Sequence, residues 1–182
     1  MITTVRPFVG TYDLDPVHSS FHFAVTHIVS TFRASFGDVD GRLVAEEGTI
    51  TLTASARVES LSIVDPPEFR EHVVRGADFF QADDYPELTF RSTEIELRDD
   101  GSTTVTGDLT IRGVTRRVSA EGTYRAPIED PFGGERAGLE LRTTVDRRAW
   151  DLSWQTPLPD GGDALGWEVE LTGHLELVKA VP

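Results

Sequence analysis

The sequence predicts an all-β protein, an antiparallel barrel of about eight strands with one short helix over one end. Two observations favour this fold class. Apolar and polar residues alternate with a period of two along most of the chain, which is typical of strands buried on one face. The links between these segments have hairpin length, and closing a sheet into a barrel removes its exposed edges. At 182 residues, the chain 1–182 is expected to form a single domain.

Six segments carry the alternation most clearly. In the first, Phe21, Phe23 and Val25 share one face with His27, so three apolar positions are followed by an imidazole. A face of this kind favours a pocket for a long apolar molecule with a polar end. The six segments are residues 21–27, 49–58, 105–111, 118–124, 139–145 and 165–177.

Residues 88–97 depart from a regular strand. Leu88 and Phe90 lie in one phase of the alternation, whereas Ile95 and Leu97 lie in the opposite phase. One extra residue in the strand brings both pairs to the same face of a sheet. The sequence therefore predicts a β-bulge between Ser92 and Glu94.

Residues 67–76 break the strand pattern altogether. Phe69, Val73 and Val74 lie on one stripe at helical spacing. Proline and Glu68 suit the first turn of a helix, and Gly76 suits its end. We therefore expect a short helix over about residues 67–76, lying across one end of the barrel.

Composition excludes several function classes. The net charge of −14 argues against nucleic acid as a partner, because phosphate backbones require a basic surface. The same charge disfavours anionic lipid surfaces, so any membrane contact is expected to be apolar and transient. The chain has no cysteine, which excludes disulfides and thiolate chemistry. Because the N-terminus lacks the features of a signal peptide, we expect a cytoplasmic protein.

Several positions that share a phase with inward-facing apolar residues are small. Small side chains leave room for a cavity inside a barrel. They also allow two backbones to approach closely, and the sequence leaves both explanations open. The small residues are Ala54, Ala56, Gly107, Ala120, Gly122 and Gly173.

Short motifs along the chain resemble the YceI-like, polyisoprenoid-binding family. Their order and spacing carry the resemblance, which covers roughly residues 10–178. It implies an elongated, lipocalin-like barrel that binds isoprenoids or other long amphiphiles, often as a dimer. The motifs include Asp15-x-x-His18-Ser19, Phe23-x-x-x-His27, Tyr85-Pro86-x-x-x-Phe90, Gly107-x-Leu109-Thr110-Ile111-x-Gly113 and Val145-Asp146-Arg147.

Two groups of residues are expected to form the binding site. An apolar tunnel would hold the chain of the ligand, since each buried CH₂ group stabilises a complex by about 0.8 kcal/mol. Cationic, imidazole and indole groups at one end would hold its polar head. The predicted tunnel residues are Phe21, Phe23, Val25, Leu109, Leu141, Val169 and Leu171. The predicted head-group residues are His27, Arg33, His72, Arg147 and Trp150.

The function predicted from these features is the sequestration or transport of an isoprenoid or fatty, lipid-like ligand by a homodimer. We expect no catalytic residue, no cofactor and no metal ion. One alternative is an enzyme that acts on a lipid-like or small apolar substrate, with His27 or His72 as acid–base. Another alternative is a stress-linked structural or interaction protein whose barrel is filled by its own side chains.

Overall fold

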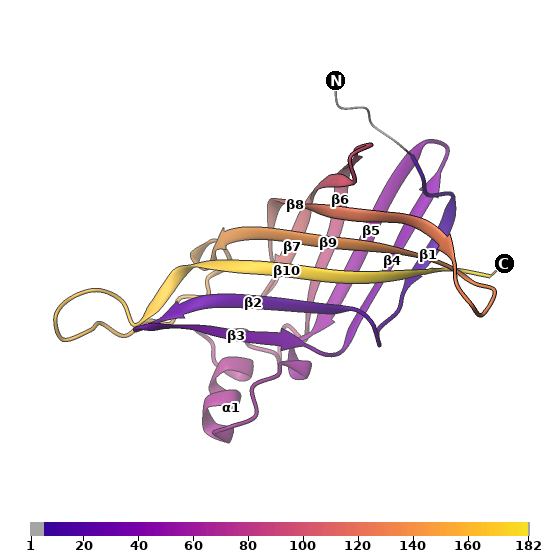
Figure 1. Ribbon diagram of the computed structural model, residues 1–182. Coiled ribbons are helices and arrows are strands. Elements are labelled where there is room, and N and C mark those ends of the chain that lie inside the picture. The colour runs from indigo at the N-terminus through magenta and orange to yellow at the C-terminus, as the bar shows by residue number, and fades with distance from the viewer. Residues whose placement is uncertain (1–5, 182) are drawn as a thin grey trace.

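The computed structural model describes residues 6–181 and confirms an all-β antiparallel barrel (Figure 1). Within these residues the chain forms ten strands, one α-helix and two short 3-10 helices. The strands are β1 (Gly10–Leu14), β2 (Ser20–His27), β3 (Ser30–Phe36), β4 (Val39–Glu46), β5 (Thr49–Arg57), β6 (Glu87–Leu97), β7 (Ser102–Ile111), β8 (Val114–Glu129), β9 (Glu135–Asp146) and β10 (Leu165–Lys179). The helices are η1 (Val58–Ser60), α1 (Pro67–Arg75) and η2 (Arg147–Trp150).

Eight of the strands described for residues 6–181 close the barrel, in the order β1-β4-β5-β6-β7-β8-β9-β10, with β10 pairing back to β1. The hairpin β2–β3 is additional to this ring. It pairs with β10 from Leu165 to His174, whereas β1 takes over the same edge of β10 from Leu177 to Lys179. The strand that alternation predicted over residues 21–27 therefore belongs to a flap on the barrel and not to the ring.

The predicted local features of the strands are present. The register between β6 and β7 shifts between Ser92 and Glu94, which confirms the bulge. Arg112 and Gly113 form the two-residue turn between β7 and β8, and both have positive φ values, of 50° and 70°. Such a turn matches the twist of the two strands, and glycine adopts it without steric cost.

The predicted helix is confirmed as α1. Pro67 occupies its first turn, and the amide of Gly76 ends it by donating to the carbonyl of His72. Val73 and Val74 are buried in the core, whereas Phe69 remains partly exposed. Figure 1 shows α1 below β3, the outer strand of the β2–β3 hairpin.

The small inward residues divide into two groups. A Cβ atom on Gly122 would lie 1.7 Å from the carbonyl oxygen of Glu140, and one on Gly107 would lie 2.4 Å from that of Arg91. These two glycines therefore allow close backbone approach. The remaining four small residues border a cavity inside the barrel: Ala54, Ala56, Ala120 and Gly173.

The end of the barrel where β10 finishes and β9 begins, here called the far end, is closed. Phe8 and Tyr12 pack edge to face, with ring centroids 5.4 Å apart, and both are buried. Tyr124 packs beside Phe8. Leu139 and Leu177 are fully buried in the same core. These buried side chains belong to the main hydrophobic core of the protein. No helix in residues 6–181 has the length and apolar character needed to cross a bilayer.

Candidate functional site

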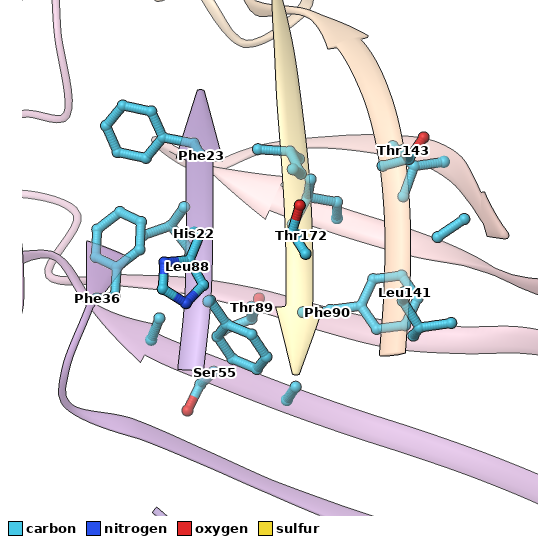
Figure 2. Close-up of a pocket in the computed structure, with 18 of the residues that line it drawn as sticks. His22, Phe23, Phe36, Ser55, Leu88, Thr89, Phe90, Leu141, Thr143 and Thr172 are labelled. Carbon is cyan, nitrogen blue, oxygen red and sulfur yellow. The ribbon is translucent and has the colours of Figure 1, made fainter. Parts of the chain in front are cut away.

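Apolar side chains of the barrel interior surround a first hollow, here called the inner cavity, with a volume of about 170 Å³. Strands from opposite sides of the sheet contribute to its wall, and Figure 2 shows these side chains between β2, β9 and β10 in front and the strands behind. A dry cavity of about 150 Å³ is large enough for one benzene-sized group. Five predicted tunnel residues line it: Phe21, Phe23, Leu109, Leu141 and Leu171.

A second hollow, the outer cavity, lies between α1 and the adjacent ends of β2, β3 and β10 and has a volume of about 510 Å³. That volume lies in the range of about 300–1,000 Å³ found for small-molecule sites. Its lining is largely apolar, and the exposed His27 lies in its wall, so the cavity reaches the protein surface. We call this end of the molecule the mouth end. Three predicted tunnel residues line the outer cavity: Phe23, Val25 and Val169.

Phe23 is common to both cavities. Its ring lies in a cluster of aromatic side chains, 6.1 Å from Phe36, 6.1 Å from Phe32 and 6.5 Å from Phe80 between ring centroids. Phe36 and Phe80 also pack edge to face, 5.8 Å apart. This cluster separates the benzene-sized inner cavity from the larger outer cavity. A ligand chain that occupies both must displace the side chain of Phe23.

The cover of the outer cavity is fixed by charged groups. Arg75, in the last turn of α1, forms ion pairs with Glu59, Glu71 and Asp83. Each of these pairs is exposed, so the network orients the helix more than it stabilises the fold.

Arg112 fixes the segment that follows α1. From the β7–β8 turn, its guanidinium donates to the carbonyl of Ala77 and to the side chain of Gln81, as well as to the carbonyl of Asp151. Residues 77–81 and the end of η2 are therefore tied to the barrel. The outer cavity is thus largely preformed.

Arg147 lines the outer cavity and is only 4% exposed. Its guanidinium donates to three backbone carbonyls, those of Gly166, Leu152 and Leu165. It also lies 4.1 Å from the ring centroid of Trp167, a cation–π contact. A guanidinium has five N–H donors, so Arg147 retains donor capacity beyond these three bonds.

Within residues 6–181, no carboxylate forms a direct ion pair with Arg147. Asp146 and Asp163 act on it electrostatically, but Asp146 binds Arg148 and Asp163 accepts from the indole of Trp167. Burial lowers the pKa of Arg147 below the ordinary value for arginine. An arginine remains charged despite such a shift, so a positive charge persists beside an apolar cavity.

His27 and His72, the predicted histidines of the head-group end, both line the outer cavity. His72 lies 3.1 Å from a carboxylate oxygen of Asp78, and its ring packs edge to face on Phe79. Phe79 stacks in turn on Trp154, with centroids 5.7 Å apart. The structure thus brings His27, His72 and Arg147 to the same cavity.

Arg33 and Trp150, the other two predicted head-group residues, lie elsewhere. Phe32 lines the outer cavity, and the alternation of β3 turns its neighbour Arg33 to the opposite, exposed face. Trp150 is buried, and its indole donates to the carbonyl of Leu109 at 3.1 Å. It packs in the core and does not line either cavity.

Much of the wall of the outer cavity was not predicted as binding residues. Phe69 and Val73 carried a sequence signal, since both lie on the apolar stripe of α1. The others come from loops, from β3 or from the first residue of β10, where no local pattern shows which cavity a side chain will line. They include Phe32, Pro66, Phe79, Phe80, Leu152, Trp154 and Leu165.

A cluster of titratable groups lies at the far end. Oxygen and nitrogen atoms of Asp15, His18 and Glu176 lie within 4.8 Å of one another. The guanidinium of Arg136 bonds to both Asp15 and Glu176, and also to Asp130. Hydrogen bonds from Arg136 and His18 hold the pKa of Asp15 well below its usual range, and Asp15 raises the pKa of His18. Because a fixed cation already occupies the cluster, it is an ion-pair network.

Comparison with known proteins places this geometry in a family. Residues 12–177 match the profile of the YceI-like domain. The chain belongs to the YceI-like family. UPF0312 protein VPA0850 of Vibrio parahaemolyticus is 31% identical over 169 residues, 92% of this chain and 85% of its own length. UPF0312 protein SAUSA300_2620 of Staphylococcus aureus is 29% identical over 171 residues, 91% and 95% of the two chains.

Solved structures share the YceI-like fold at low sequence identity. BcnA of Burkholderia cenocepacia has a TM-score of 0.72 at 19% identity, covering 90% of this chain and 98% of its own. A polyisoprenoid binding domain from Saccharophagus degradans, implicated in plant cell wall breakdown, has a TM-score of 0.66 at 12% identity, covering 93% and 98%. At these identities the likeness concerns the fold alone. The predicted family and the eight-stranded barrel are confirmed.

Proposed function

We propose that this protein binds a long-chain amphiphile, such as a polyisoprenoid or a similar lipid, and carries or sequesters it without chemical change. The observation that carries the proposal is the pair of apolar cavities that meet at Phe23. Removal of the ligand chain from water supplies the affinity, at about 0.8 kcal/mol for each buried CH₂ group. Ordering the chain and the loss of its free motion offset part of this gain. The Saccharophagus degradans domain, named for polyisoprenoid binding, supports this ligand class.

The polar end of the ligand would lie in the outer cavity beside Arg147, His27 and His72. A buried guanidinium without a direct carboxylate partner favours a carboxylate or phosphate head. We expect Arg147→Lys to weaken binding of a long-chain fatty acid several-fold, while binding of the matching alcohol changes little. Lysine keeps the charge but cannot reproduce the planar set of donors. Equal losses for both ligands would show that Arg147 only supports the backbone.

Native mass spectrometry of protein purified from its own cells, followed by organic extraction, tests the proposed function. We expect a lipid-sized mass that leaves the protein with the solvent. The matched control is Leu171→Trp, which places an indole in the inner cavity and should reduce the recovered lipid. A bare polypeptide mass, together with failure to take up an added long-chain probe, would contradict the proposal.

One observation favours the enzymatic alternative, the hydrogen bond between His72 and Asp78 in the outer cavity. A histidine oriented by a carboxylate is a common general base. Incubation of the protein with the extracted lipid, followed by mass analysis, separates the two functions. An unchanged lipid supports carriage, whereas a product that disappears in His72→Gln while binding persists would establish catalysis.

A further inference from the structure

The tip of the β2–β3 hairpin has an unusual composition. His27 pairs with Ser30, which leaves Ile28 and Val29 as a two-residue turn. Turns of this length favour Asn, Asp and Gly, because they require positive φ values that β-branched side chains resist. Ile28 nevertheless has a φ of 50°, and Val29 is 94% exposed. A strained turn with two solvent-exposed apolar side chains does not stabilise the folded protein. It therefore indicates a functional role, such as contact with another molecule.

This tip borders the mouth of the outer cavity. His27, the residue before Ile28, lies in the cavity wall, and the amide of Ile28 is held by the carbonyl of Ala164 at 2.8 Å. Phe69 lines the same cavity from α1 and is 40% exposed. Its ring packs edge to face on Phe32, with centroids 6.0 Å apart. Exposed apolar groups from two elements therefore stand beside one opening.

The hairpin is also free of acidic residues. The chain contains 31 Asp and Glu residues, yet none occurs in the 22 positions from Pro16 to Gly37, where the titratable side chains are three histidines and Arg33. This segment can approach lipid phosphates without the repulsion that a net charge of −14 otherwise produces. Glu68 and Glu71 on the neighbouring helix are exposed, and so are Asp160 and Asp163 in the loop whose Ala164 carbonyl binds the amide of Ile28. These acids restrict insertion to the tip and disfavour anionic lipid.

We propose that the hairpin tip, Ile28 and Val29, inserts into the surface of a zwitterionic lipid bilayer and, with Phe69 resting on that surface, holds the mouth of the outer cavity against it. The proposal rests on the proposed function, since it gives an apolar ligand a path from bilayer to cavity that avoids water. A stable protein–protein interface buries at least about 1,200 Å² in total, far more than a two-residue tip offers. Shallow insertion into a bilayer requires only a few apolar side chains.

Flotation with vesicles of pure phosphatidylcholine tests the docking surface. We expect the intact protein to float with the vesicles, and Val29→Asp to reduce the floating fraction about tenfold, because a charge must then enter the apolar layer. Phe132→Asp is the matched control. Phe132 is 92% exposed at the β8–β9 turn, but Glu129, Asp130 and Glu135 flank it. We expect this variant to bind as the unaltered protein does.

The same assay has clear contrary outcomes. Docking at the hairpin is overturned if the unaltered protein does not float, or if Val29→Asp and Phe132→Asp lose binding equally. It is also overturned if the unaltered protein is a dimer that Val29→Asp converts to a monomer without any vesicle binding, since the tip is then a contact between copies. Replacing part of the neutral lipid by phosphatidylglycerol should weaken flotation, and stronger flotation would contradict the role assigned to charge.

A second measurement separates this inference from the proposed function. A long-chain fluorescent fatty acid is titrated into the protein in solution, without vesicles. Val29→Asp should bind this probe as tightly as the unaltered protein, since Val29 does not line either cavity. If the unaltered protein binds the probe but does not float, the docking surface alone is contradicted. If it floats but does not bind the probe, the proposed function is contradicted and the protein is only membrane-associated.

Discussion

At the far end of the barrel β10 packs into a closed core, whereas at the mouth end the same strand borders two hollows. Leu177 is buried among the side chains of the far end, while Val169 and Leu171 line cavities. The alternation of β10 is the same at both ends. The difference arises from the strand that pairs with β10. Near Leu177 this strand is β1, which closes the ring, whereas from Leu165 to His174 it is β2 of the β2–β3 hairpin.

The buried or partly buried arginines of the two ends also differ in their hydrogen-bond partners. At the far end, Arg136 bonds to three carboxylates, of Asp15, Asp130 and Glu176. At the mouth end, Arg147 bonds to backbone carbonyls, and the acids near it are committed to other partners. The comparison teaches that one strand can border a closed, fully paired core at one end of the barrel and apolar cavities with a buried cation at the other.

The largest effect is expected from shortening a leucine of the far end. Leu177→Ala should lower the free energy of unfolding by about 3 kcal/mol, because a fully buried leucine leaves a cavity that the core fills only partly. Val169→Ala, on the same strand, should cost at most about 1 kcal/mol, since its side chain already borders empty space. Urea unfolding measures both values. Similar losses of unfolding free energy for the two variants would show that the two ends do not differ in packing.

An intermediate effect is expected at the boundary between the cavities. Phe23→Ala should cost about 2 kcal/mol of stability, because the ring is packed but only half-buried. The same change joins the two cavities, so we expect tighter binding of longer fatty-acid probes relative to short ones. Unfolding and probe titrations are to be carried out on the same preparation. An unchanged dependence on chain length would show that Phe23 does not divide the site.

A smaller effect, with a defined pH dependence, is expected from the ion-pair network. Hydrogen bonds from Arg136 lower the pKa of Asp15, and those from the Gly134 amide and Arg136 lower the pKa of Asp130. Groups with lowered pKa values stabilise the fold above their unfolded value of about 3.9, and this contribution is lost as the pH falls below it.

Arg136→Met should therefore reduce stability at pH 7 and flatten the decline of stability between about pH 5 and pH 2. Thermal unfolding across this range measures the change. Arg42→Met, which removes an exposed ion pair with Asp13, is the control and should leave the profile almost unchanged. Parallel pH profiles for Arg136→Met and the unaltered protein would contradict the role of the network.

The smallest effect on stability is expected from filling the inner cavity. Leu171→Trp adds volume where about 170 Å³ is empty, so stability should change by less than about 1 kcal/mol. Binding of a long-chain fatty-acid probe should nevertheless weaken at least fivefold. A variant that remains as stable and binds as tightly as the unaltered protein would show that the inner cavity takes no part in binding.

Sequence reasoning predicted seven of the ten strands described for residues 6–181, the β6–β7 bulge and α1, because each depends on a local pattern of side chains. It gave no segment for β1, β3 or β4. All seven apolar residues predicted to line a tunnel border at least one of the cavities, and their role in binding stays a prediction. Sequence reasoning placed Arg33 and Trp150 wrongly in space. Arg33 lies on the exposed face of β3, opposite the outer cavity, and the indole of Trp150 donates to the carbonyl of Leu109. For these residues the surroundings are set by distant strands, which a local pattern does not reveal.

Alternation in the sequence determined which face of each strand is buried, and the helical stripe of residues 69–74 determined that one segment is not a strand. Only the tertiary structure decided that β2–β3 lies outside the ring, that Phe23 separates two cavities and that Arg147 has no ion-pair partner among residues 6–181. The physical reason is the range of the forces involved. Side-chain periodicity acts between neighbours in the chain, whereas hollows and unpaired charges depend on which distant segments come together.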